Sequence, residues 1–140
     1  MKKLGEQLAK SAFPGEFIAF FGDLGAGKTT LVRYLASALG VDAAVSPTFT
    51  IVRQYDGGRI PIFHFDCYRI ADADELFAIG FDDYLSLDAL IVMEWSENVP
   101  EALPEERLEI HILGSGDDPR TVELISTSPS YDAIIGGITL

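Results

Sequence analysis

Hydrophobic positions along the chain change between short continuous runs and a helix-like spacing, which predicts strands that alternate with helices. Residues 16–21 and 89–94 are short apolar runs of the kind found in buried strands. Residues 28–39 place apolar side chains on one helical face, and a glycine follows where such a helix ends. Residues 72–79 predict a second helix, with an aspartate cap at its start and a glycine after its end.

Two pairs of β-rich runs predict antiparallel hairpins. Residues 48–55 and 60–66 flank an Asp-Gly-Gly turn, and residues 107–113 and 121–126 flank a second turn that contains glycine and proline. Strands that alternate with helices, together with hairpins, predict an α/β fold whose sheet mixes parallel and antiparallel pairs. The pattern assigns no element to the last ten residues of the chain.

Length and charge narrow the class of protein. The chain has 140 residues, which fits one domain over residues 1–140, and its net charge is −12. Most of such a surface should repel bare nucleic acid, so any role with RNA is expected to run through a protein partner; the alternative is that acidity only keeps the chain soluble. No apolar run approaches the ~20 residues of a membrane helix and no signal peptide is visible, so we expect a cytoplasmic protein without a membrane partner. Cys67 is the only cysteine, which excludes an internal disulfide.

A glycine loop joins the first predicted strand to the first predicted helix and matches the pattern G-x-x-x-x-G-K-[ST]. Its residues are Gly22, Asp23, Leu24, Gly25, Ala26, Gly27, Lys28 and Thr29. Glycines let successive backbone N–H groups converge on phosphate oxygens, and a helix N-terminus adds the positive end of its dipole. Lys28 supplies a cation for the terminal phosphates, and the Thr29 hydroxyl is a ligand for Mg²⁺. The alternative is a strand-to-helix turn that is rich in glycine by chance.

Two acidic residues follow predicted strands and are candidates for the chemistry. Glu94 ends an apolar run, where a carboxylate can hold Mg²⁺ directly or through water, or orient the attacking water. Asp66 ends another run and can accept a proton from water or bind a metal-bound water. The alternatives are a solvated acid at a strand end for Glu94 and an ion pair with a cation such as Arg69 for Asp66. His64 shares a strand face with Asp66 and is interpreted as a structural histidine.

Thr48 follows Ser-Pro in a segment where many ATPases place a loop that senses the terminal phosphate. A hydroxyl there can turn toward Mg²⁺ or the γ-phosphate. The alternative is a strand start set by the proline. The loop motif and the acids together predict a three-layer fold of the P-loop NTPase type.

The whole series of motifs resembles one family. The segments GDLGAGKTTLVRYLASALG, SPTFTIVRQY, FHFDCYRI, LFAIGFDDYL and MEWSE follow one another as in the TsaE (YjeE) proteins of bacteria, small P-loop ATPases needed to make threonylcarbamoyladenosine in tRNA. The resemblance implies ATP phosphates on residues 22–28, with Lys28 acting in hydrolysis, and Mg²⁺ on Thr29 and Glu94. It implies that Asp66 is required for hydrolysis, that Thr48 belongs to a switch-like loop, and that Thr30 lies near the nucleotide.

The resemblance also implies partners. TsaE-like proteins bind TsaD, which transfers the threonylcarbamoyl group, together with TsaB, and slow ATP hydrolysis resets that complex; tRNA is reached indirectly through these partners. Family members usually begin with a further segment near the adenine, so the base contacts stay open here, as does a nucleotide contact of Arg120. The main alternative is a small-molecule kinase in which Asp66 deprotonates a hydroxyl, although the arginines are scattered and form no lid cluster. A guanine-nucleotide switch is disfavoured, because the sequence has no N-K-x-D stretch.

Overall fold

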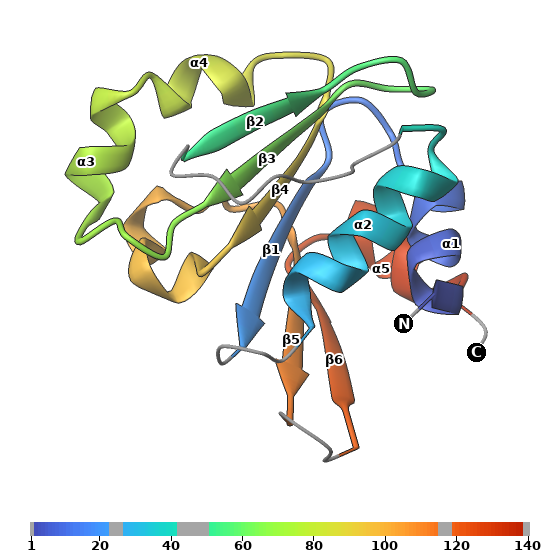
Figure 1. The fold of residues 1–140 in the computed structure, drawn as a ribbon. Helices are drawn as coiled ribbons and strands as arrows, with labels where there is room; N and C mark the ends of the chain where they lie inside the picture. The colour runs from blue at the N-terminus through green and yellow to red at the C-terminus, as the bar shows by residue number, and fades with distance from the viewer. Residues whose placement is uncertain (1, 23–26, 42–50, 115–118, 139–140) are drawn as a thin grey trace.

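The computed structural model describes residues 2–22, 27–41, 51–114 and 119–138. Its six strands form one sheet in the order β2-β3-β4-β1-β5-β6. The four central strands run parallel to one another, and the two edge strands β2 and β6 pair antiparallel with their neighbours (Figure 1). The strands are β1 (Phe17–Gly22), β2 (Val52–Tyr55), β3 (Ile62–Asp66), β4 (Leu90–Glu94), β5 (Leu108–Leu113) and β6 (Thr121–Ser126). This arrangement confirms the predicted α/β fold with a mixed sheet and both predicted hairpins.

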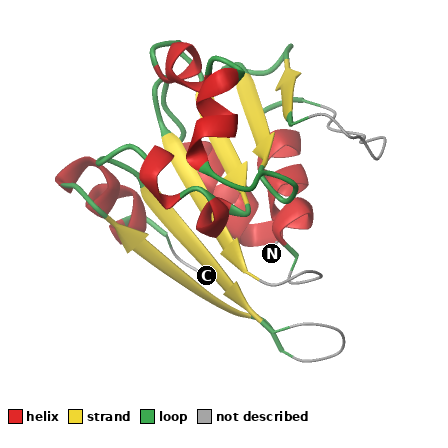
Figure 2. Cartoon of the chain, turned by 90° about the vertical axis from the view of Figure 1, so that its left-hand side faces the viewer, coloured by secondary structure: helices red, strands yellow, loops and turns green. Residues whose placement is uncertain are grey.

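Helices cover both faces of the sheet and make the fold three-layered. Figures 1 and 2 show α1, α2 and α5 on one face, with α3, α4 and two 3₁₀ turns on the other. The helical elements are α1 (Lys2–Ser11), α2 (Lys28–Ala38), α3 (Ala73–Ala78), α4 (Phe81–Leu85), η1 (Ser96–Asn98), η2 (Pro100–Ala102) and α5 (Pro129–Gly136). None of the helices in the described part of the chain is long and apolar enough to cross a membrane.

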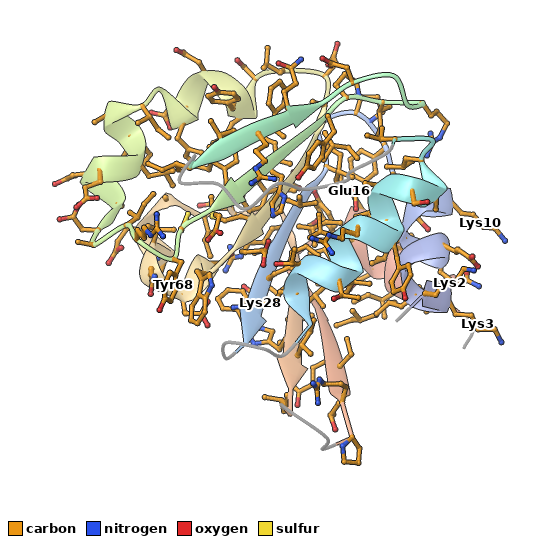
Figure 3. All side chains as sticks on the ribbon, in the orientation of Figure 1. Lys2, Lys3, Lys10, Glu16, Lys28 and Tyr68 are labelled. Atoms are coloured by element: carbon orange, nitrogen blue, oxygen red, sulfur yellow. The ribbon has the colours of Figure 1, made fainter. Side chains whose placement is uncertain are left out.

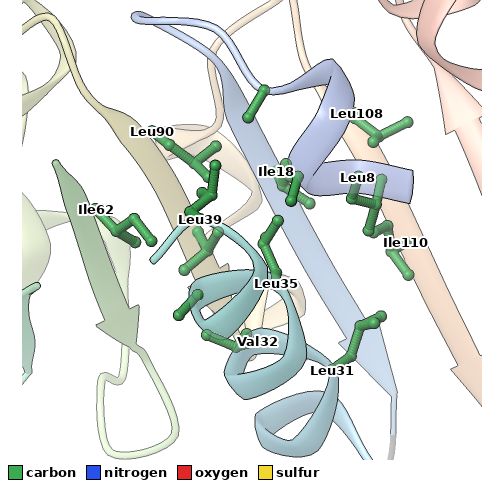
Figure 4. Close-up of a cluster of buried hydrophobic side chains, with 14 of the residues drawn as sticks. Leu8, Ile18, Leu31, Val32, Leu35, Leu39, Ile62, Leu90, Leu108 and Ile110 are labelled. Carbon is green, nitrogen blue, oxygen red and sulfur yellow. The ribbon is translucent and has the colours of Figure 1, made fainter. Parts of the chain in front are cut away.

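The described residues form two hydrophobic cores, because successive side chains of a strand point to opposite faces of the sheet. In β1, Ile18 packs toward α1 and α2, where Leu8 and Leu35 are also fully buried (Figure 4). Phe17 packs on the other face, with Phe81 of α4. The continuous apolar run in β1 therefore reflects burial on both faces, as expected for a central parallel strand.

The predicted helices are confirmed at α2 and α3. The side chain of Asp72 caps α3 by accepting a hydrogen bond from the backbone N–H of Glu75 at 3.1 Å. Gly80 follows α3 with a φ of 86°, a left-handed conformation that glycine adopts without a steric penalty. The sequence pattern did not predict α1, α4 or α5. The antiparallel strand predicted over residues 48–55 begins at Val52 in β2, and residues 48–50 lie outside the described residues.

Close contact between α1 and α2 depends on a glycine inside α1. A Cβ atom added to Gly5 would lie 2.6 Å from the Cβ atom of Tyr34 in α2. Glycine normally weakens a helix interior by roughly 0.5–1 kcal/mol relative to alanine. Here its lack of a side chain lets the two helices approach, so α1 can bury Leu4 and Leu8 against the sheet and α2.

Candidate functional site

The carboxyl ends of the parallel strands bring three predicted site residues to one edge of the sheet. Gly22 ends β1, Asp66 ends β3 and Glu94 ends β4, and the last two are direct partners in the β3–β4 register. Ligands in open α/β sheets bind at this edge, outside the carboxyl ends of the strands. Two residues that are far apart in the sequence, Asp66 and Glu94, thus become neighbours because their strands pair.

The two ends of the glycine loop meet through Lys28. Its side chain is 4% exposed, and its Nζ atom donates a hydrogen bond to the carbonyl oxygen of Gly22 at 2.5 Å. Gly27 precedes α2 with a φ of 105°, which favours glycine at that position. Thr29 and Thr30 follow in the first turn of α2 and are exposed. Asp23, Leu24, Gly25 and Ala26 of the loop, and Thr48, lie outside the described residues.

Glu94 is the centre of a hydrogen-bonded chain. Its Oε1 atom accepts a hydrogen bond from the Thr29 hydroxyl at 2.8 Å, and its Oε2 atom lies 2.5 Å from Nε2 of His64. The other ring nitrogen of His64, Nδ1, lies 3.0 Å from the hydroxyl of Tyr55. A chain of four side chains therefore runs from the edge strand β2 through β3 and β4 to the first turn of α2.

The charge of Glu94 follows from these contacts. Burial alone would raise the pKa of this carboxyl group, which is 4% exposed. The hydrogen bond and charge of His64, the hydroxyl of Thr29 and the ammonium of Lys28 outweigh burial and hold the pKa of Glu94 below its usual range. The site thus contains a buried carboxylate beside a buried ammonium, with the hydroxyl of Thr29 next to the carboxylate.

Asp66 is held at the same edge but is exposed to solvent. Its Oδ1 atom accepts a hydrogen bond from the backbone N–H of Tyr68 at 3.0 Å, which orients the carboxylate at the end of β3. The side chain is therefore accessible to water. Its direct register partner Glu94 is buried instead, so the two acids have different environments and are suited to different tasks.

A single turn after β4 contacts both the start of the glycine loop and the residue that follows β3. The carboxylate of Glu97 accepts a hydrogen bond from the Gly22 backbone N–H at 3.2 Å, and the amide of Asn98 donates to the Cys67 carbonyl oxygen at 2.9 Å. Before them, the ring of Trp95 lies under the ammonium of Lys28, 3.3 Å from its centroid. This tryptophan therefore contacts the lysine of the glycine loop.

The residues present suit Mg²⁺ as part of a larger ligand set. Mg²⁺ prefers oxygen ligands and usually binds through one or two protein groups together with phosphates and water. The oxygen atoms of Thr29 and Glu94 are adjacent and meet that preference. Within residues 2–22, 27–41, 51–114 and 119–138, no group of three or more His, Cys, Asp or Glu side chains is arranged to hold a metal ion. Any ion here would take the rest of its ligands from a bound molecule or water.

Sequence reasoning missed the contact between His64 and Glu94 and the roles of Tyr55, Trp95 and Glu97. Alternation correctly placed His64 on the same strand face as Asp66, but the partner across β4 depends on strand register, which no local pattern reveals. His64 is nevertheless the buried, hydrogen-bonded histidine that the sequence predicted. His111 has an acidic neighbour two residues earlier in β5, because its Nε2 atom lies 2.9 Å from Oε1 of Glu109.

Comparisons with known proteins identify the family. Residues 1–122 match the family model of the threonylcarbamoyl adenosine biosynthesis protein TsaE. The tRNA threonylcarbamoyladenosine biosynthesis protein TsaE of Bacillus subtilis is 38% identical over 134 residues, 95% of this chain and 84% of the relative. The protein of the same name in Haemophilus influenzae is 41% identical over 127 residues, 89% of this chain and 80% of the relative.

A solved structure agrees with the sequence comparisons. The crystal structure of Bacillus subtilis YdiB superposes with a TM-score of 0.78 at 33% sequence identity and covers 96% of this chain and 84% of that one. The similarity in sequence and in fold extends over the strands that carry Gly22, Asp66 and Glu94. On these grounds, the chain belongs to the TsaE family.

Proposed function

We propose that this chain is a single ATPase domain over residues 1–140 that binds Mg-ATP and hydrolyses it slowly in support of tRNA threonylcarbamoyladenosine synthesis. The relatives from Bacillus subtilis and Haemophilus influenzae are named as biosynthesis proteins of that nucleoside. The observation that carries the proposal is the buried Lys28 ammonium at the start of α2, beside the Thr29–Glu94 pair. A cation, a helix N-terminus and oxygen ligands for a metal converge there, as a triphosphate requires.

Each side chain has a distinct task in this proposal. Lys28 neutralises oxygens of the terminal phosphates, and Thr29 and Glu94 hold Mg²⁺, which supplies charge stabilisation on the same phosphates when it is bound. His64 holds the Glu94 carboxylate in one orientation through Oε2, while Thr29 contacts Oε1. Asp66 is exposed and accepts a proton from the water that attacks the terminal phosphate.

The nucleotide proposal is tested by the binding of Mg-ATP, measured by isothermal titration calorimetry. Lys28→Ala removes a charge-assisted contact and should weaken binding by about 1.5–3 kcal/mol. The matched control is Lys10→Ala, which removes an exposed lysine from α1 and should leave binding unchanged. Equal binding by wild type and Lys28→Ala would contradict the proposal.

The partners are proposed to be TsaD and TsaB, with tRNA reached through them in the cytoplasm. The net charge of −12 supports contact with RNA through a partner, because the acidic surface repels a phosphate backbone. ATP hydrolysis should be measured with the purified protein alone and with a TsaB–TsaD pair, together with co-purification of the three proteins. If the three proteins do not associate and the pair does not change the rate of hydrolysis, the partnership is refuted. Stoichiometric phosphoryl transfer to a metabolite would favour a kinase instead.

A further inference from the structure

We propose that Trp95 is a positioning residue that holds the Lys28 ammonium ready for a phosphate ligand. This inference deepens the proposed ATP site and rests on it. The ring centroid of Trp95 lies 3.3 Å from Nζ of Lys28, a short distance for a cation over an aromatic face. The same ammonium donates to the Gly22 carbonyl oxygen, so the lysine is held between the loop entrance and the ring.

The backbone at Trp95 has an energetically unfavourable conformation that accompanies this contact. Trp95 has a φ of 59° and is the only residue other than glycine with a positive φ in the described part of the chain. A bulky side chain in that region is disfavoured, and such conformations persist mainly where the surrounding structure requires them. Here the turn directly after β4 keeps the ring beside the start of α2. Tyr68 supports the ring from another side, with a centroid distance of 5.0 Å.

An aromatic face suits this task better than a carboxylate. Lys28 is 4% exposed, so its charge needs compensation before any ligand arrives. A ring attracts the ammonium through its quadrupole and carries no net charge, so it adds no negative charge where a phosphate would bind. A carboxylate in the same place would neutralise the lysine and repel the ligand. Glu94 is the nearby acid: its charge interacts with that of Lys28, while its two carboxylate oxygens contact Thr29 and His64.

The tryptophan also restricts a flexible side chain. Lysine has a four-carbon stem whose ordering on binding reduces affinity. The ring and the Gly22 carbonyl oxygen fix the end of that stem before binding. Figure 3 shows Lys28 and Tyr68 at the same end of the sheet, so the aromatic pair lies where the proposed phosphates enter. Loss of the ring should weaken the binding of ligands that carry phosphates and spare those that do not.

The contact itself is tested without nucleotide. Trp95 is the only tryptophan in the chain, so its fluorescence emission reports on this position alone. Lys28→Met should change the emission of the ligand-free protein, because a charge beside the indole perturbs its excited state. Lys10→Met, on the exposed face of α1, is the matched control and should leave the emission unchanged. Identical spectra for wild type and Lys28→Met would overturn the inference.

The positioning role is tested by the dissociation constant of Mg-ATP for Trp95→Phe and Trp95→Leu. We expect affinity in the order Trp, Phe, Leu, with a loss of about three- to thirtyfold for leucine, the range of cation–π contacts. In a Lys28→Met background the same changes at Trp95 should have no effect, and adenosine should bind all folded variants alike. Equal affinity of the leucine variant, or the same loss without Lys28, would overturn the inference.

Two controls separate the possible failures. Thermal unfolding followed by circular dichroism shows whether each variant is folded; if the leucine variant is not, the phenylalanine variant and the emission comparison decide. If wild type binds no ATP, the proposed function fails, whereas the ligand-free emission still decides whether Trp95 holds Lys28.

Discussion

Glu16 should make the protein less stable as the pH rises from mildly acidic to mildly basic values. This residue precedes β1 and is 1% exposed. Its Oε1 atom accepts a hydrogen bond from the Phe13 backbone N–H at 3.2 Å, while Oε2 has no hydrogen-bond partner among the described residues. Burial raises the pKa of Glu16 from 4.5 to about 8, although the Phe13 hydrogen bond and the Arg59 charge act in the opposite direction.

The sign of the effect follows from which state holds the proton. Between pH 4.5 and about 8 the unfolded chain has lost the proton of Glu16 and the folded protein keeps it, so folding takes up a proton. The free energy of unfolding therefore falls as pH rises through this window, by up to about 1.4 kcal/mol per pH unit. Over the whole window the loss amounts to about 5 kcal/mol at most, a large share of the stability of a small domain.

Glu16→Gln removes the titration and keeps the shape and the acceptor for Phe13. We expect the variant to be about as stable as wild type near pH 4.5 and more stable by up to about 5 kcal/mol near pH 8. Urea unfolding at pH 5, 6.5 and 8 measures the difference. Glu6→Gln, at an exposed position of α1, is the control and should show little pH-dependent gain. A difference between wild type and Glu16→Gln that does not grow with pH would refute the reasoning.

Three further predictions concern helix packing, helix capping and hydrolysis. Gly5→Ala should lower the melting temperature, since the new Cβ would lie 2.6 Å from that of Tyr34, whereas Gly136→Ala has nothing within 4 Å and should preserve or raise it; a gain at Gly5 would contradict the packing argument. Asp72→Ala should cost about 1 kcal/mol in urea unfolding through loss of the α3 cap, and an unchanged midpoint would show that the cap contributes little. Asp66→Ala should reduce the rate of ATP hydrolysis, measured as release of inorganic phosphate, more than it reduces ATP binding. A normal rate of hydrolysis would remove this residue from the proposed mechanism.

The sheet and α2 were predictable because their signals are local. A continuous apolar run predicts β1 wherever it lies, and the spacing of Leu31, Val32 and Leu35 already indicates a helix with one buried face. The first helix was missed for a physical reason. Gly5 weakens its intrinsic helix propensity, and the helix forms because the glycine permits close packing on α2. Propensity and packing act in opposite directions there, and packing prevails.

In the candidate site, too, some features were predictable from local sequence and others depend on the assembled fold. The loop motif and the acids at the ends of β3 and β4 are readable from the sequence, because each stands beside its own local signal. The contacts of Glu94 with Thr29 and His64 span 65 and 30 residues and exist only after three elements have assembled. The place of Trp95 under Lys28 depends in addition on an unusual backbone conformation, which no pattern of hydrophobic residues indicates.

Because the central strands run parallel, the buried acid that limits stability and the residues of the proposed site lie at opposite ends of the sheet. Glu16 lies just before the amino end of β1, and Lys28 lies beyond its carboxyl end, so roughly 20 Å of strand stands between them (Figure 3). The fold can therefore be stabilised at the amino end of β1 without disturbing the residues at its carboxyl end. The Glu16→Gln variant would serve as a more stable background in which to crystallise and assay variants of residues at the carboxyl end.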